Sequence, residues 1–147
     1  MTVVVGVDGS PESYAAIRIG REEAGLRGTR LVTVMAYSTE GMLGAPAGRP
    51  LTTPHSPGED RLQAESTLRS VVKAALGDDD SAAEEVVEAG PPGRVLVETA
   101  RDLGALMIVL SARKERTPAR LLGAVSQYVL RNAPCPVLVV PEAGKAR

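Results

Sequence analysis

One stretch near the N-terminus decides the fold: TVVVGVDGSP, at residues 2–11. Residues 2–7 form a continuous, mostly β-branched run, which is typical of a strand buried on both faces of a parallel sheet. The run ends at a turn, after which Ser10 suits the N-cap and Pro11 the first position of a helix. The stretch therefore predicts a buried strand followed directly by a helix over about residues 11–26.

The same pairing of strand and helix recurs along the chain. Short apolar runs predict further strands, and segments with helical spacing of apolar residues predict the helices between them. The strands are expected at residues 30–36, 84–88, 106–110 and 137–140, and the helices at 59–76, at 94–103 and from 118 or 123 onward. Alternation of this kind predicts an α/β fold with an open, doubly wound, five-stranded parallel sheet and helices on both faces.

The whole chain, residues 1–147, is expected to form a single domain, because its length suits one hydrophobic core. Residues 37–58 are rich in Pro and Gly and show no periodicity, and a structureless segment of that length is uncommon inside a compact domain. We expect a loop there, with three alternatives: a lid over a ligand, a partner site or a disordered segment. Residues 142–147 are expected to form a solvated tail.

Composition argues against several classes of function. The chain carries 17 Lys and Arg against 18 Asp and Glu, a net charge of −1 that gives no electrostatic footprint for nucleic acid or an anionic membrane. A single Cys, Cys135, and a single His, His55, argue against a structural zinc site, and neither has an evident catalytic partner. No signal peptide or apolar run of the ~20 residues needed to span a bilayer is apparent. We expect a cytoplasmic protein that is not an enzyme and holds no metal.

The carboxyl ends of the strands are where a ligand is expected, because open parallel sheets bind ligands in the crevice beyond those ends. Asp8 follows the first strand, and residues 111–126 follow the fourth. The Asp8 carboxylate could accept hydrogen bonds from a base or a ribose, or it could cap the first helix. The two roles are compatible with each other.

Two stretches, VGVDGS at residues 5–10 and GAVSQYVLRNAPCPVLVV at residues 123–140, resemble the universal stress protein family. The resemblance extends over about residues 2–141. It implies a role in the stress response, a sheet of the adenine nucleotide alpha hydrolase-like, Rossmann-like type, and frequent homodimerisation through the last strand. That strand is Val137-Leu138-Val139-Val140, and an apolar edge strand of this kind invites pairing with a second copy.

Part of this family binds ATP through a pattern of Gly, two residues, Gly, nine residues, and Gly followed by Ser or Thr. Leu110 and Arg113 stand at the first two glycine positions, Gly123 keeps the third, and Ala124 replaces the hydroxyl residue. Side chains at the first two positions obstruct the approach of backbone N–H groups to phosphates, and Ala124 removes a hydrogen-bond donor. The resemblance therefore implies that ATP with Mg binds weakly or not at all.

Three functions stay open. One is a binding or signalling module that acts through unknown protein partners. Another is a slow nucleotide hydrolase, for which the sequence shows no general base. The remaining one is a stress sensor that binds ATP or another adenine nucleotide in the crevice. Its candidate binding residues are Asp8, Val34, Gly123, Val125 and Ser126, with anion contacts from Arg113, Arg116 and Arg120. Those arginines could hold an anion by charge, or they could belong to a solvated charged loop.

Overall fold

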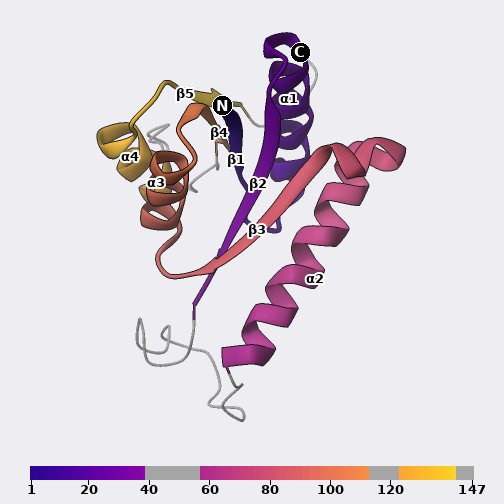
Figure 1. Cartoon of the computed structure of the whole chain (residues 1–147). Helices are drawn as coiled ribbons and strands as arrows, with labels where there is room; N and C mark the ends of the chain where they lie inside the picture. The colour runs from indigo at the N-terminus through magenta and orange to yellow at the C-terminus, as the bar shows by residue number, and fades with distance from the viewer. Residues whose placement is uncertain (39–56, 113–122, 142–147) are drawn as a thin grey trace.

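The computed structural model describes residues 1–38, 57–112 and 123–141 (Figure 1). Strands and helices alternate along the chain, as the sequence predicts. The elements are β1 (Thr2–Gly6), α1 (Glu12–Arg27), β2 (Arg30–Tyr37), α2 (Pro57–Leu76), the 3-10 helix η1 (Gly77–Ala82), β3 (Ala83–Ala89), α3 (Pro92–Asp102), β4 (Ala105–Ser111), α4 (Ala124–Asn132) and β5 (Val137–Val140).

The five strands form one parallel sheet in the order β3-β2-β1-β4-β5. The chain first winds outward from β1 to β3 and then returns to the other side of β1 for β4 and β5. Helices α1 and α2 cover one face of the sheet, and α3 and α4 cover the other (Figure 1). The predicted α/β class and the open, doubly wound sheet are confirmed, and the strand order reverses between β1 and β4.

Two hydrophobic clusters lie on opposite faces of the sheet, and β1 contributes to both of them. Val3 and Val5 point into the cluster under α1 and α2, whereas Val4 points into the cluster under α3 and α4. All three side chains are fully buried, which explains why the strand reads as a continuous apolar run. The alternation of strand side chains thus lets one short run supply both cores.

The start of α1 differs from the prediction. The N-cap is Pro11 and not Ser10, and no side-chain hydrogen bond caps the helix at that position. The Ser10 hydroxyl donates to the carboxylate of Asp8, and the N–H of Ser13 donates to the backbone carbonyl of Ser10 at 3.1 Å. The hydroxyl is thus directed toward the preceding turn, since hydroxyl side chains bond to whichever nearby group is best placed.

Other element boundaries shift by small amounts. α2 and α3 each begin two residues earlier than predicted, and α4 begins at Ala124 after Gly123, which settles the ambiguous start of the last helix. Residues 77–80 belong to η1, where Asp80 pairs with Arg69 of α2. The long segment predicted after β2 lies outside the described residues over 39–56, and so does the tail at 142–147. No helix within the described ranges combines the length and the hydropathy needed to cross a membrane.

Candidate functional site

A crevice opens at the carboxyl ends of β1 and β4, where the strand order reverses. It encloses about 270 Å³ and lies between the N-terminal ends of α3 and α4. The residues that line it are Gly6, Val7, Asp8, Pro92, Leu96, Leu110, Ser111, Gly123, Ala124, Val125 and Ser126. This is the position at which an open parallel sheet is expected to bind a ligand.

Asp8 stands at the rim of the crevice and organises the turn between β1 and α1. One oxygen of its carboxylate accepts hydrogen bonds from the backbone N–H of Ser10 at 2.9 Å, from the Ser10 hydroxyl, and from the Ser13 hydroxyl at 2.8 Å. Gly9 adopts a positive φ of 84° inside this turn, a conformation that favours glycine. The carboxylate is exposed and held in a fixed orientation, so structural and binding roles can coexist, as the sequence suggests.

The N-terminus of α4 forms the opposite wall of the crevice. Gly123 is its N-cap, with extended backbone and no side-chain cap hydrogen bond. The first N–H groups of a helix lack partners within the helix and carry a partial positive charge, which favours anions. Ala124 and Val125 occupy that first turn, and the Ser126 side chain is buried behind them. The wall can therefore attract a phosphate or carboxylate through its backbone, without a hydroxyl at position 124.

Leu110 fills the deep end of the crevice. Its side chain is only 4% exposed, and it packs with the α3–α4 cluster. A Cβ placed on Gly6 would lie 2.7 Å from Cδ2 of Leu110 and 2.7 Å from Cδ1 of Leu96, so these two leucines occupy the space above Gly6. Where the family pattern has glycine and open backbone, this chain has a packed aliphatic side chain.

The structure brings four of the five predicted nucleotide-binding residues together. Asp8, Leu110 and the segment from Gly123 to Ser126 all line the crevice. Val34 does not: its side chain is 1% exposed in the core, and its carbonyl accepts a hydrogen bond from Val7 N–H at 2.9 Å. The arginines predicted to contact an anion, Arg113, Arg116 and Arg120, lie outside the described residues.

Four lining residues escaped the sequence reasoning: Gly6, Val7, Pro92 and Leu96. Pro92 and Leu96 belong to α3, which reaches the crevice only because the chain crosses over from the β3 edge to the middle of the sheet. The topology is the signal that could have identified Pro92 and Leu96. The helix that leads into the first strand beyond the switch point begins beside the crevice, and here that helix is α3, which leads into β4.

Other reactive groups offer little chemistry. Within residues 1–38, 57–112 and 123–141, no three His, Cys, Asp or Glu side chains are grouped so that they could hold a metal ion. Burial raises the pKa of the Cys135 thiol, and a hydrogen bond with the Ile108 backbone offsets part of that rise. A raised pKa keeps the thiol protonated at neutral pH, which disfavours a nucleophilic role.

The fold and the crevice together define an open, doubly wound α/β protein whose ligand site lies at the topological switch point. The model of the Universal stress protein family matches residues 1–141, and the chain belongs to that family. It is 34% identical to Universal stress protein Rv2623 of Mycobacterium tuberculosis, over 94% of this chain and 46% of that protein. The chain thus spans about half the length of the curated relatives it matches.

Solved structures agree with this assignment. A universal stress protein in complex with cAMP is 27% identical with a TM-score of 0.69, and the match covers 97% of this chain and 98% of that one. The universal stress protein from Archaeoglobus fulgidus in complex with dAMP is 25% identical with a TM-score of 0.69, covering 95% and 96% of the two chains. These neighbours share the fold, and their ligands are adenine nucleotides with a single phosphate group.

Proposed function

We propose that this chain is a binding or signalling module of the stress response that binds Mg-ATP weakly or not at all and acts through protein partners. The observation that carries the proposal is the Leu110 side chain, which is packed over Gly6 inside the crevice. Backbone N–H groups hold phosphates best where glycines let them approach closely, and a buried leucine prevents that approach.

Two further features support weak ATP binding. Ala124 offers no hydroxyl in the first turn of α4, and a hydrogen bond to a charged group is worth about 1.5–3 kcal/mol, which is roughly one to two decades of affinity. The crevice volume of about 270 Å³ also lies below the range of roughly 300–1,000 Å³ that is usual for small-molecule sites. We expect both features to weaken the binding of the polyphosphate more than that of an adenosine group at the rim of the crevice.

A second function has a specific observation in its favour. Two structural neighbours carry cAMP and dAMP, and this crevice keeps an exposed carboxylate at its rim and a helix N-terminus on its far wall. A nucleotide with a single phosphate group would need fewer N–H donors than ATP needs. An adenine-nucleotide sensor that prefers monophosphates is therefore the runner-up.

A slow nucleotide hydrolase has less support. Asp8 is the one carboxylate among the described residues that line the crevice, and its hydrogen bonds hold the turn that leads into α1. A general base must reach the attacking water in the right geometry. We therefore propose no catalytic residue.

Calorimetric titration of the nucleotide-stripped chain tests the nucleotide proposals. We expect no heat with Mg-ATP up to millimolar concentration. The triple variant Leu110→Gly, Arg113→Gly, Ala124→Ser should bind ATP at least about a hundredfold more tightly than the parent, because it restores phosphate donors. Ala133→Ser, at the far end of α4, is the matched control and should gain nothing.

The titration also separates the alternatives. Micromolar binding of AMP or cAMP by the parent chain, lost in Asp8→Asn, would favour the monophosphate sensor. Micromolar binding of Mg-ATP by the parent chain would contradict weak ATP binding. Release of phosphate from ATP that stops in Asp8→Asn would support the hydrolase.

A homodimer through β5 is the partner arrangement we propose. β5 forms one edge of the sheet, and Val137, Leu138 and Val139 are only partly buried there. Two copies that meet through this edge would form a two-fold dimer. Light scattering at micromolar concentration should give twice the monomer mass, and Leu138→Lys should lower it to the monomer mass. A monomeric parent chain would contradict the proposal.

A further inference from the structure

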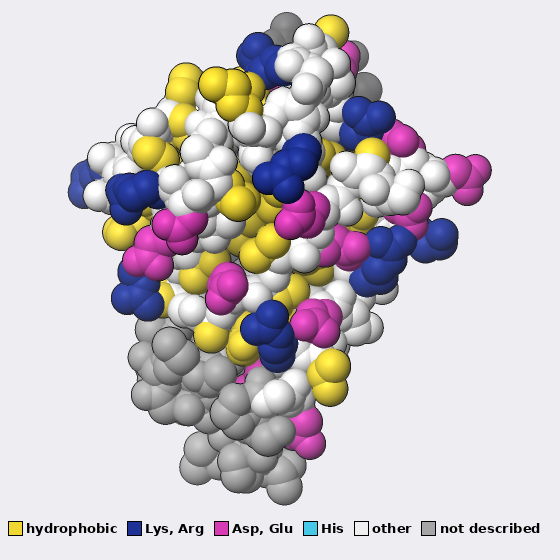
Figure 2. Space-filling model, viewed as in Figure 1, with side chains coloured by type: hydrophobic (Ala, Val, Ile, Leu, Met, Phe, Trp, Pro, Cys, Tyr) yellow, Lys and Arg dark blue, Asp and Glu magenta, His cyan; other side chains and the backbone are white. Residues whose placement is uncertain are grey.

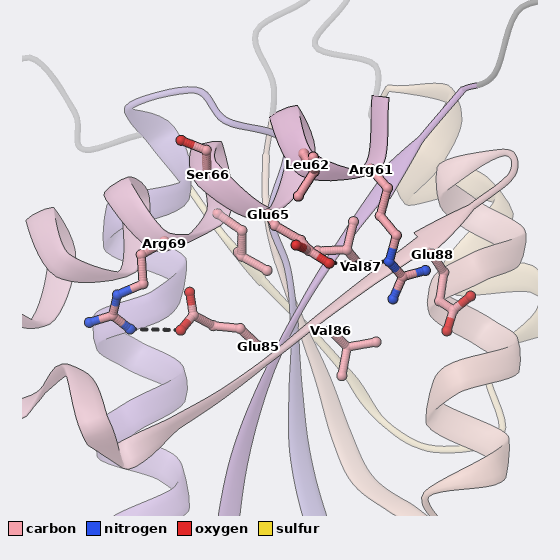
Figure 3. A pocket seen from close by; sticks show the side chains of 10 residues that line it. Arg61, Leu62, Glu65, Ser66, Arg69, Glu85, Val86, Val87 and Glu88 are labelled. Carbon is pink, nitrogen blue, oxygen red and sulfur yellow. Dashed lines mark hydrogen bonds and ion pairs between the residues drawn. The ribbon is translucent and has the colours of Figure 1, made fainter. Parts of the chain in front are cut away.

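A second hollow lies on the other side of the molecule from the crevice, along the outer edge of β3. This groove encloses about 590 Å³ between β3 and α2 (Figure 3). Helix α2 contributes Leu62, Glu65 and Arg69 to it, and β3 contributes Glu85 and Glu88. Neither of the nucleotide hypotheses uses these residues, so the groove requires a separate account.

The backbone of β3 has one side that faces away from the sheet. The N–H of Gly90 donates to the carbonyl of Tyr37 at 2.9 Å, and the Thr33 hydroxyl donates to the carbonyl of Glu84 at 3.1 Å. Since alternate residues of a strand direct their backbone groups to the same side, the even-numbered residues 84–90 face β2. The N–H and C=O groups of residues 85, 87 and 89 therefore face outward.

No strand of the described part of the chain pairs with that outer edge, because β3 stands at the end of the sheet order. An edge of seven residues that no described strand pairs with is a template for another extended chain. Proteins that avoid such pairing place charged side chains, especially Lys, Pro or a bulge on the edge. β3 has no Lys and no Pro, its register with β2 runs without a break from Ala83 to Ala89, and its charged side chains are all carboxylates.

The charge of β3 selects the kind of chain that could pair with it. The strand carries three carboxylates, Glu84, Glu85 and Glu88, and no cation. Glu84 pairs with Arg30 at 3.2 Å and Glu85 pairs with Arg69 at 2.7 Å, whereas Glu88 is exposed and has no ion pair with any described residue. Opposite charges across neighbouring strands attract and like charges repel, so a basic strand is favoured.

The same charges disfavour a second copy as the occupant. Two β3 strands side by side would bring six carboxylates together against the Arg30 and Arg69 of each copy, and the Glu88 side chains would gain no new cation, so like charges would repel across the pair. Between the charges the groove is apolar: Leu62 is 66% exposed at its rim, and Val86 and Val87 belong to its wall. Figure 2 shows hydrophobic side chains over the middle of this face, with acidic and basic side chains interspersed.

We propose that β3 is a docking edge for an extended basic segment of a partner protein, which adds to the sheet as a sixth strand. Backbone hydrogen bonds to residues 85, 87 and 89 supply affinity, as in other cases of strand addition. Alternating basic and apolar side chains on the segment meet Glu88 and the apolar groove around Leu62. This activity is independent of the nucleotide crevice, so either proposal can fail without the other.

Fluorescence anisotropy with labelled peptides tests the docking edge on the full chain. The probe is Lys-Val-Lys-Val-Lys-Val-Lys, and we expect a Kd on the order of micromolar that weakens with added salt. The acidic analogue Glu-Val-Glu-Val-Glu-Val-Glu should not bind. A basic peptide in which every backbone N–H is methylated keeps the charge and the side chains but lacks the N–H donors, and it should bind at least about tenfold more weakly.

Variants of the chain test where the peptide binds. Glu88→Lys should weaken the basic peptide about three- to tenfold, because it turns an attractive cross-strand pair into a repulsive one. Glu22→Lys, on the exposed side of α1, makes the same change in net charge away from the groove and should leave the affinity unchanged. Hydrogen exchange should show new protection of the amides of residues 85, 87 and 89 on binding, with those of 86 and 88 protected throughout.

Several outcomes would overturn the docking edge. Equal binding of the basic and N-methylated peptides would mean that charge alone attracts them, without strand addition. Absence of binding by the basic peptide would contradict the docking edge. Unchanged hydrogen exchange at residues 85, 87 and 89 on binding would contradict it too. A dimer in which those three amides are protected before any peptide is added would identify a second copy as the occupant.

Discussion

The two faces of the sheet are packed differently although β1 supplies both of them. Under α1 and α2 the core is continuous, and a Cβ on Gly20 of α1 would come within 2.3 Å of Cγ2 of Val5. Under α3 and α4 the packing ends near Gly6 and Leu110, and the crevice begins there. On the closed face the packing is continuous where α1 meets β1 and opens into a groove only at the β3 edge, whereas the open face keeps a hollow between two helix N-termini.

This difference in packing assigns stability mainly to the closed face of the sheet and ligand binding to the open face. Close-packed interiors respond to a change of a single methyl group, whereas a solvent-open hollow can take up such a change. The crevice can therefore vary in sequence without loss of the fold. Family members with the same architecture can thus differ in the ligand they hold.

Truncation of one buried leucine on each face should give the largest effect. Leu68 of α2 is fully buried on the closed face, and Leu96 of α3 is 5% exposed beside the crevice. We expect Leu68→Ala to lower the free energy of unfolding by about 3–5 kcal/mol and Leu96→Ala by about 2–3 kcal/mol, because the second cavity merges with an existing hollow.

Urea denaturation of the parent chain and both variants measures these values. Leu62→Ala serves as the control on α2, because Leu62 is 66% exposed and its loss should cost less than about 0.5 kcal/mol. A larger cost for Leu96→Ala than for Leu68→Ala would mean that the open face, and not the closed one, dominates the stability of the sheet.

The sequence predicted the fold better than it predicted the site, and the reason is the range of the interactions. The β-branched runs and the strand–helix alternation are local signals, so the open, doubly wound sheet followed once right-handed crossovers were assumed. Asp8, Leu110 and the segment 123–126 were recognised from motifs that lie at strand and helix ends. Their meeting in one crevice follows from the switch point between β1 and β4.

The errors come from details that no local signal contains. Val34 lies inside β2 and pairs with Gly6, the last residue of β1, but its side chain faces the core, since the register of β2 decides the direction of each side chain. Ser10 does not cap α1, because its hydroxyl is directed toward the Asp8 carboxylate in the preceding turn. Leu96 reaches the crevice only through the crossover to α3. The groove along β3 likewise depends on which strand lies at the edge of the sheet.

Substitution of one glycine on each face compares how tightly the two faces are packed, and it should change the free energy of unfolding less than the leucine truncations do. Gly20→Ala on α1 should cost about 2–3 kcal/mol, because the new Cβ meets the stiff, fully buried Val5. Gly93→Ala on α3 should cost about 1 kcal/mol or less, although its Cβ would lie 2.8 Å from Cδ1 of Tyr128. Tyr128 is 42% exposed on α4, so its ring can move toward solvent.

Gly25→Ala supplies the matched control for this pair. Gly25 lies on the same helix as Gly20, and its added Cβ would meet only the guanidinium of Arg21, at 3.3 Å. Alanine is the better helix former, so Gly25→Ala should raise the free energy of unfolding by up to about 1 kcal/mol. Thermal unfolding of the three variants gives the order of effects. If Gly93→Ala proved as costly as Gly20→Ala, the contact between α3 and α4 would be as rigid as the closed face, and the walls of the crevice would be fixed in position.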